Sequence, residues 1–313
     1  NIIVFDQRFH KNSSVSFINT NVTRNGSFRD GNVSALVWDL NTSKNTYNLS
    51  GNFEYSYVND IEEEKKGINT SLNFAETSGK YRYSFGTNLV TKDFDNNDLG
   101  IIFETNYYDF YGNASYRILN PTKIFNSFNT NINAYSQFQK ETGKLQGNQI
   151  NLNVNSTTKK NHYIGFGMQY SPFNSYDFYE PRTSGRYSII PTRVEGWMSI
   201  STNYNHKFAF DINPSVAFVN EPGRKSFGIS LSPRYRFNDR LALYYSFDFL
   251  KKNIILSSGS EGSSQRPDNS DLVITSFFYF KLFFRSKEIC ISLHLSCWHN
   301  RNKVNLFSTI NLS

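Results

Sequence analysis

The sequence lacks long apolar runs and is poor in cysteine and histidine, and each shortage excludes a class of protein. Nowhere in its 313 residues does an apolar stretch approach the ~18–20 residues that a membrane-spanning helix needs. On one extended strand, Cys290 and Cys297 would lie on opposite faces about 23 Å apart, too far for a disulfide. Their spacing fits neither a redox motif nor a zinc site, and the five histidines form no metal-ligand or Ser/His/Asp pattern. We therefore predict no catalytic residue, metal site or cofactor.

The chain also lacks a concentrated block of positive charge. It carries 33 Lys and Arg against 26 Asp and Glu, a net charge of +7, but these residues form neither a basic helix nor a contiguous run. Nucleic acid is therefore not an expected partner. Asn1 begins the chain without the charged segment and apolar core of a signal peptide, so either an export signal has been removed or the chain is a piece of a longer protein.

Aromatic residues, in contrast, are abundant, and many of them alternate with polar residues. The chain contains 29 Phe, 20 Tyr and 3 Trp, together 17% of its residues. In residues 46–58 (TYNLSGNFEYSYV), every second residue from Tyr47 to Tyr57 is apolar or glycine, and the residues between them are polar. This period of two predicts a β-strand with one apolar and one polar face. The segment is long enough to cross a bilayer, which takes roughly 9–11 residues of a tilted strand.

The same pattern recurs along the chain, and long and short connections alternate between the predicted strands. Outer-membrane barrels show this asymmetry, with short periplasmic turns and long extracellular loops. We therefore predict an all-β fold, an antiparallel transmembrane β-barrel of about 14–16 strands in which residues 1–313 form one domain and residues 1–12 a periplasmic lead-in. The predicted strands cover residues 13–23, 32–40, 46–58, 67–76, 80–91, 107–118, 128–138, 150–157, 163–170, 192–204, 207–218, 226–237 and 241–250.

Charged residues inside these strands agree with a membrane environment. Most of them occupy the alternate strand positions that carry polar residues, which we call the polar parity. Asp39 and Glu76, which lie beside short turns, occupy the apolar positions instead. An Arg or Lys that faces lipid costs about 2–4 kcal/mol near the mid-bilayer and ~0–1 kcal/mol near the interfaces, so a membrane would enforce this placement. A soluble β-sandwich or β-solenoid that binds sugar stays an alternative, which a requirement for detergent would distinguish. The charges on the polar parity are Glu54, Arg82, Asp109, Arg117, Arg193, Glu195, Asp211, Arg234, Arg236 and Asp248.

Amide side chains are concentrated on the polar parity near the centre of the chain. Amides both donate and accept hydrogen bonds, which suits a neutral, hydroxyl-rich solute such as an oligosaccharide. The alternative is that asparagine simply tolerates water in a barrel interior. The candidate ligand-binding amides are Asn129, Asn131 and Asn133 on one predicted strand and Asn151 and Asn153 on the next.

The connection at residues 171–191 is the second candidate site. It contains Asp177, Tyr179, Glu180 and Arg182 close together in the sequence. Aromatic faces and carboxylates suit sugar recognition, and paired carboxylates can cleave a glycosidic bond. The alternative is a loop that is folded in and held by ion pairs and aromatic packing.

Three stretches resemble an uncharacterised bacterial outer-membrane β-barrel family, domain of unknown function 5916. They are residues 12–23 (NSSVSFINTNVT), 110–117 (FYGNASYR) and 176–182 (YDFYEPR), and the resemblance covers most of residues 12–253. In that family the barrel usually follows a domain resembling family-9 carbohydrate-binding modules; that domain is absent here, so its sugar-binding residues do not carry over. Residues 277–313 differ from the family and are expected to form closing strands or an altered tail.

The function expected from these features is that of an outer-membrane channel, receptor or scaffold. The resemblance implies a link to glycan binding or uptake in the bacterial outer membrane. The expected partners are the lipid bilayer, an oligosaccharide, and periplasmic or outer-membrane proteins. We favour a role without catalysis, but a second class of function stays open: a membrane-anchored carbohydrate-active hydrolase, with its chemistry in a missing N-terminal domain or in the 171–191 loop.

Overall fold

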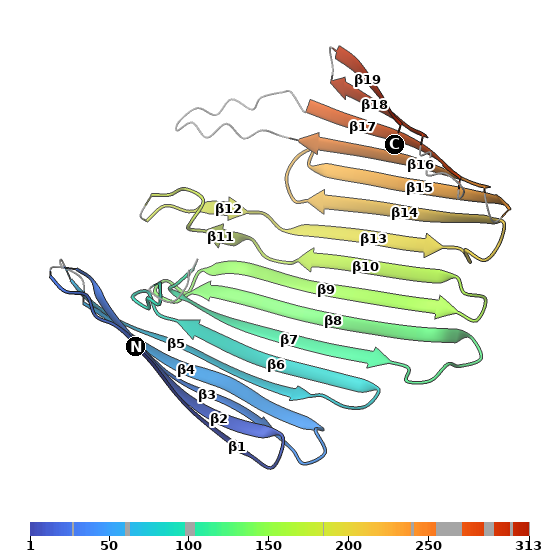
Figure 1. Cartoon of the computed structure of the whole chain (residues 1–313). Coiled ribbons are helices and arrows are strands. Elements are labelled where there is room, and N and C mark those ends of the chain that lie inside the picture. Colours follow the sequence, from blue (N-terminus) through green and yellow to red (C-terminus); the bar gives the residue numbers. More distant parts are fainter. Residues whose placement is uncertain are drawn as a thin grey trace. The chain divides into compact units, whose positions relative to one another are not determined.

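The computed structural model describes residues 1–26, 28–59, 63–97, 104–183, 185–238, 241–254, 271–284, 291–300 and 303–312, with side chains up to residue 250. These residues form strands and turns and contain no helix, and therefore none that is long and apolar enough to cross a membrane. Of the strands that they form, 17 belong to one antiparallel sheet (Figure 1), so the all-β antiparallel part of the prediction is confirmed. The strands are β1 (Ile2–Phe9), β2 (Ser13–Val22), β3 (Asp30–Asn41), β4 (Tyr47–Asn59), β5 (Glu64–Glu76), β6 (Tyr81–Val90), β7 (Tyr107–Arg117), β8 (Phe125–Gln139), β9 (Leu145–Thr158), β10 (Tyr163–Ser171), β11 (Ser175–Asp177), β12 (Ser188–Ile190), β13 (Arg193–Ser201), β14 (Phe208–Val219), β15 (Lys225–Asn238), β16 (Leu241–Ile254), β17 (Asp271–Phe284), β18 (Ile291–Asn300) and β19 (Lys303–Leu312).

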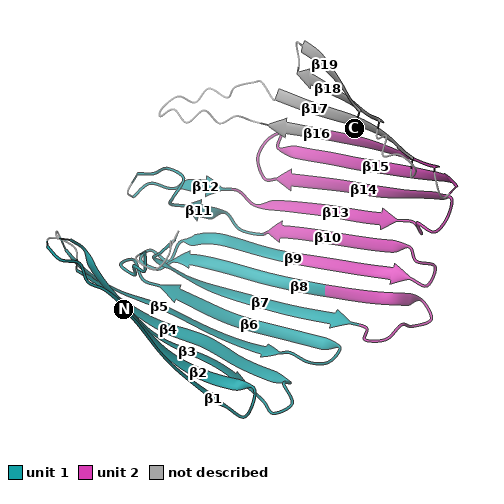
Figure 2. Ribbon diagram, in the orientation of Figure 1, with its two compact units in different colours: residues 1–117, 131–150, 172–190 teal, residues 118–130, 151–171, 191–313 magenta. Residues whose placement is uncertain are grey.

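The chain divides into two compact units, which Figure 2 distinguishes by colour. In unit 1, strands β1 to β7 pair antiparallel in chain order. In unit 2, β10 pairs with β13, and β13 to β19 continue in chain order. The small β11–β12 hairpin belongs to unit 1. Unit 1 consists of Asn1–Arg117, Asn131–Ile150 and Pro172–Ile190, and unit 2 of Ile118–Thr130, Asn151–Ser171 and Pro191–Ser313.

The strands of unit 1 have a polar face and an apolar face, because the register aligns like side chains across them. One row on the apolar face joins Phe17, Leu36 and Phe53. The neighbouring row on the polar face is made of Asn52, Ser71, Asn88 and Asp109, on β4 to β7.

Burial in unit 1 is the reverse of that in a soluble protein. The apolar face is exposed: Phe53 and Leu72 each expose 45% of their surface. On the polar face, Ser56 is 0% exposed and Asp109 5% exposed. In soluble proteins, large apolar side chains are the ones most often buried and charged ones are mostly exposed.

Unit 2 shows the same inversion. Along β10, Ile164, Phe166, Met168 and Tyr170 are all exposed, and the glycines between them are buried. On the opposite face of the sheet, polar side chains bond to one another, as where Ser199 Oγ donates to Asn213 Oδ1 across β13 and β14 at 2.6 Å.

Two aromatic pairs of unit 1 lie in the β5–β6–β7 region. Near the β5–β6 turn, the ring centroids of Phe74 and Phe85 are 5.4 Å apart, and Tyr81 lies 4.9 Å from Tyr116. The turn itself contains Gly79 at a φ of +88°, a conformation that glycine adopts without strain. The sequence predicted this short turn.

Several boundaries differ from the prediction. Residues 2–9 of the predicted lead-in form β1, which pairs with β2. β5 begins at Glu64, β9 at Leu145 and β15 at Lys225, so three of the connections predicted to be long are short. Closure of the sheet into a barrel stays a prediction.

Two further details concern single residues and the tail. Asp39 pairs with Ser50 and therefore lies on the polar face, so the predicted break in parity at Asp39 is wrong. Glu76 pairs with Tyr47 and does lie on the apolar face, at the end of β5. The tail forms β17, β18 and β19, whereas Cys290 lies outside the described residues.

Candidate functional site

The polar face of unit 1 carries a network of hydrogen bonds between side chains. Asn52 and Asn69 donate to the two carboxylate oxygens of Glu54, at 2.6 and 3.2 Å, and Ser71 Oγ donates to Asn52 Oδ1. In the same row, Asn88 Nδ2 donates to Asp109 at 2.9 Å. Acids and amides thus bond to one another on this face, and such hydrogen bonds hold the side chains that make them in fixed positions.

Two of the predicted amides belong to a second group of bonded amides on this face. Asn113 Nδ2 donates to Asn133 Oδ1 at 2.5 Å, and Asn133 Nδ2 donates to Asn131 Oδ1 at 3.0 Å. All three residues belong to unit 1, whereas Asn129 belongs to unit 2 and is exposed. Asn131 and Asn133 are thus bonded to each other, whereas the side chain of Asn129 is exposed.

The predicted amides Asn151 and Asn153 line a small pocket of about 170 Å³ in unit 2, which we call the strand pocket. Asn153 Nδ2 donates to Asn151 Oδ1 at 3.0 Å, which orients both amides. The remaining lining comes from β10 and β13 and includes a tryptophan and a carboxylate. The full lining is Asn151, Asn153, Met168, Gln169, Glu195 and Trp197.

Trp197 is one of four residues of the strand pocket that the sequence analysis did not predict as site residues; the others are Met168, Gln169 and Glu195. Trp197 pairs with Gly167 on β10 and Ser215 on β14, which places its indole on the polar face. A Cβ at Gly167 would lie 2.2 Å from Trp197 Nε1, so the ring occupies space that only glycine leaves open. The sequence signal was the Gly165-Phe166-Gly167 repeat, in which small residues alternate with large ones on a predicted strand.

A larger polar pocket of about 550 Å³, the loop pocket, lies in unit 1 among the connections between strands. Phe94, 2% exposed, anchors it by packing against Gly67, where a Cβ would lie 2.1 Å from Phe94 Cα. Arg29 pairs with Asp95 at 2.8 Å, and Asp95 N donates to Ser56 Oγ. The lining residues are Glu63, Lys65, Lys92, Asp93, Phe94, Asp95, Asn97, Glu104, Thr105 and Tyr179.

Electrostatics distinguish the two main carboxylates of the loop pocket. Burial raises the pKa of Glu104. A hydrogen bond of 2.5 Å from Gln137 Nε2 acts to lower this pKa, and the negative charges of Asp177 and Asp109 act to raise it further. Burial also acts to raise the pKa of Asp95, but hydrogen bonds from Arg29 and Asn97 outweigh it and lower that pKa. Asp95 is thus held ionised by a partner, whereas Glu104 lies in a region of negative potential.

The second predicted site, in the strap (Pro172–Ile190), is folded onto unit 1. Asp177 Oδ1 accepts hydrogen bonds from the backbone N–H of Tyr179 and of Glu180, at 2.8 and 3.0 Å, and so caps a turn. Tyr179 Oη donates to the carbonyl of Thr105 at 2.9 Å and lines the loop pocket. The side chains of Glu180 and Arg182 are exposed. Of the four predicted residues, Tyr179 alone lines the loop pocket, and the charge of Asp177 acts on Glu104 there.

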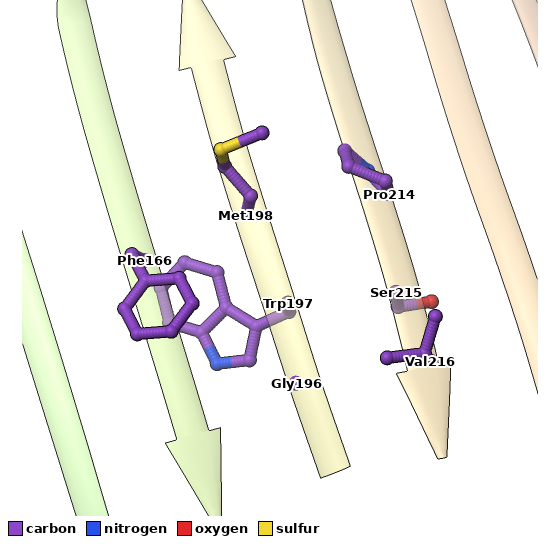
Figure 3. A pocket seen from close by; sticks show the side chains of 7 residues that line it. All are labelled: Phe166, Gly196, Trp197, Met198, Pro214, Ser215 and Val216. Carbon is purple, nitrogen blue, oxygen red and sulfur yellow. The ribbon is translucent and has the colours of Figure 1, made fainter.

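The apolar face of unit 2 is also hollowed, over about 270 Å³ (Figure 3). Gly196 lies in this hollow, between side chains of β10, β13 and β14. The nearest atoms to a Cβ at Gly196 would be 3.8 Å away, so the hollow results from the missing side chain. The lining is Phe166, Gly196, Trp197, Met198, Pro214, Ser215 and Val216.

Within the part of the chain that the structure describes, His, Cys, Asp and Glu form no group of three that could hold a metal ion. A family model described as "Domain of unknown function (DUF5916)" matches residues 1–270, a span that reaches to just before β17. A comparison with curated proteins found no match.

Proposed function

The chain belongs to the DUF5916 family, and we propose that it is a β-barrel of the bacterial outer membrane whose water-filled interior binds and passes neutral, hydroxyl-rich solutes such as oligosaccharides. The proposal rests on the inverted polarity of both units. Apolar side chains on one face need a hydrocarbon environment, and polar side chains on the other need water or a polar solute. A sheet in lipid must leave no unpaired edge, so the proposal requires closure into a ring.

The burial of apolar residues supports this proposal quantitatively. Among the described residues, the buried hydrophobic side chains are few and mostly small. A soluble domain of this size would instead bury a core of large aliphatic and aromatic residues. The aromatic pairs near the strand ends also match the rings that barrels place at the membrane interfaces. The buried hydrophobic residues are Val58, Val90, Phe94, Ala209 and Ala242.

The strand pocket supports the choice of solute. Trp197 offers an aromatic face, and Asn151, Asn153 and Gln169 offer paired donors and acceptors. A pyranose has one apolar face and a rim of hydroxyls, and this combination of an aromatic ring with amides matches both. Glu195 adds an acceptor, with Arg193 3.7 Å from it.

Two tryptophans on opposite faces provide the test of membrane insertion. Trp38 pairs with Gly51 on the apolar face, and Trp197 lies on the polar face. We would prepare one protein with Trp38 as its sole tryptophan and one with Trp197, replacing the others, including Trp298, by Phe. In vesicles, brominated acyl chains should quench Trp38 fluorescence and iodide should quench Trp197. Equal quenching of both by iodide, with no effect of bromine, would contradict insertion.

Conductance in a planar bilayer then tests the passage of solutes. The detergent-purified chain should form stable channels that oligosaccharides block. Gly167→Ala should weaken the block because its Cβ would displace the Trp197 ring, whereas Gly196→Ala, with space for a Cβ, should leave it unchanged. An inserted protein that conducts no ions would refute the open interior and indicate a plugged barrel or scaffold.

A further inference from the structure

Three aromatic rings of the strap surround the ammonium group of Lys144. Its Nζ lies 3.8 Å from the ring centroid of Tyr187, 5.2 Å from that of Tyr176 and 6.0 Å from that of Phe178. These distances fall within the ~6 Å at which a cation is attracted to a ring face. All four residues belong to unit 1, so the contact is internal to one compact unit.

The rings are arranged as the walls of a cage. The planes of Tyr176 and Tyr187 are nearly perpendicular, at 83° with centroids 5.1 Å apart, and Phe178 is tilted 56° to Tyr187 at 5.5 Å. The hairpin register explains the arrangement. Asp177 pairs with Ser188, so the next pair toward the hairpin loop is Phe178 opposite Tyr187. Tyr176 lies two residues before Phe178 and therefore on the same side of the hairpin. We call Tyr176, Phe178 and Tyr187 the aromatic cage.

The cage does not depend on Lys144 to hold the strap in place. Tyr179 Oη bonds to the Thr105 carbonyl, and Asn148 exchanges two hydrogen bonds with the backbone of Phe173, at 2.8 and 3.1 Å. These contacts attach both ends of the Phe173–Tyr179 segment to unit 1 independently of the ammonium group. Removal of the Lys144 charge should therefore leave an assembled and empty cage.

The cage is open to ligands from solution, since Tyr187 is 40% exposed. A primary ammonium is a compact, strongly hydrated charge, so a lysine loses much hydration when it enters such a cage. A quaternary ammonium spreads its charge over methyl groups and loses less, which is why aromatic cages recognise choline and methylated lysine. Lys144 occupies the cage because it is tethered beside it, at an effective concentration on the order of millimolar.

We propose that the aromatic cage is a binding site for quaternary and other methylated ammonium groups, and that Lys144 occupies it as an intramolecular competitor that such a ligand displaces. This site is distinct from the strand pocket, and the proposal does not require that the protein conduct solutes.

The test measures binding of choline to the full chain in detergent by calorimetry or saturation-transfer NMR. Lys144→Gln removes the competitor and should bind choline about fivefold to tenfold more tightly than the unmodified protein. Lys144→Arg keeps a cation over the rings and should behave like the unmodified protein. Adding Tyr187→Ala to Lys144→Gln should abolish binding, whereas adding Phe173→Ala, in the strap but outside the cage, should not.

A second measurement needs no variant. Choline at millimolar concentrations and above should free Lys144 and raise its rate of acylation several-fold, read by mass spectrometry, while Lys140 in the same connection serves as the internal control. Absence of saturable binding to Lys144→Gln, binding that survives Tyr187→Ala, or acylation of Lys144 that choline leaves unchanged would each overturn the proposal.

Discussion

The inverted polarity of the sheet can be tested with two adjacent residues near the middle of β5. Leu72 lies on the apolar face, is 45% exposed and pairs with Gly51 and Thr87. Ser71 lies on the polar face and pairs with Asn52 and Asn88. Because the two residues are neighbours, arginine at either position would lie at nearly the same depth in the proposed barrel, and only the face would differ.

The expected magnitudes differ between the two variants. In the proposed barrel, Leu72→Arg exposes a guanidinium to lipid near the mid-bilayer, at a cost of about 2–4 kcal/mol, or roughly 30-fold to 900-fold in the folding equilibrium. Ser71→Arg keeps its charge on the polar face and loses the Ser71–Asn52 hydrogen bond, which is worth about 1 kcal/mol. In a soluble sheet, Leu72→Arg would be an exposed substitution that changes stability by roughly 0.5 kcal/mol or less.

The assay is a urea titration of folding into lipid vesicles, followed by tryptophan fluorescence and protease resistance. Each variant is compared with the unmodified protein at matched lipid concentration. Leu72→Arg should be less stable than Ser71→Arg by at least about 1 kcal/mol, which is the smallest difference between the estimated costs of the two substitutions. Equal midpoints for the two variants would refute the argument from polarity.

The loop pocket supplies three further predictions. Gly67→Ala should lower the free energy of unfolding by about 1–3 kcal/mol in the same assay, since its Cβ would overlap Phe94 and displace the loop. Arg29→Ala should be less stable than the unmodified protein at neutral pH. That difference should shrink as the pH falls through the lowered pKa of Asp95, because the ion pair stabilises only the charged carboxylate. Glu104→Gln should be the more stable protein at neutral pH, and the gain should vanish below the ordinary pKa of glutamate, because the raised pKa makes ionisation costly only as the pH rises. Melting temperatures between pH 3 and pH 8 measure the last two effects.

The strands were predictable where the local pattern alone decides them. Residues 46–58 alternate cleanly, and β4 runs from Tyr47 to Asn59. β1 was missed because Ile2, Ile3, Val4 and Phe5 are consecutive apolar residues without alternation, and their strand exists through pairing with β2. Asp39 was misplaced for a related reason. Its face depends on the cross-strand register with Ser50, and the parity of β3 by itself is ambiguous because Val33, Ala35 and Val37 share the polar face.

The candidate sites were predictable only in part, because they combine residues that are distant in the sequence. The amides were visible as a pattern within one strand, and Asn151 and Asn153 do line a pocket. Their companions Gln169 and Glu195 come from β10 and β13, and strand order and register bring them there. The loop pocket was not predictable, since Tyr179 meets Thr105 through a fold of the strap that follows no local periodicity.

Aromatic content was the main sequence argument for a membrane barrel, and the structure shows that the rings divide into two groups. Rings on the apolar face lie beside one another, as Phe74 lies beside Phe85, which is 59% exposed. Trp197, in contrast, lies over Gly167 among amides on the polar face, where Tyr111 and Tyr163 likewise lie over Gly86 and Gly165. A ring on a polar face can stack on a solute that has an apolar face. The two groups therefore support separate parts of the proposed function: the rings on the apolar face support its membrane environment, and Trp197 supports the class of its solute.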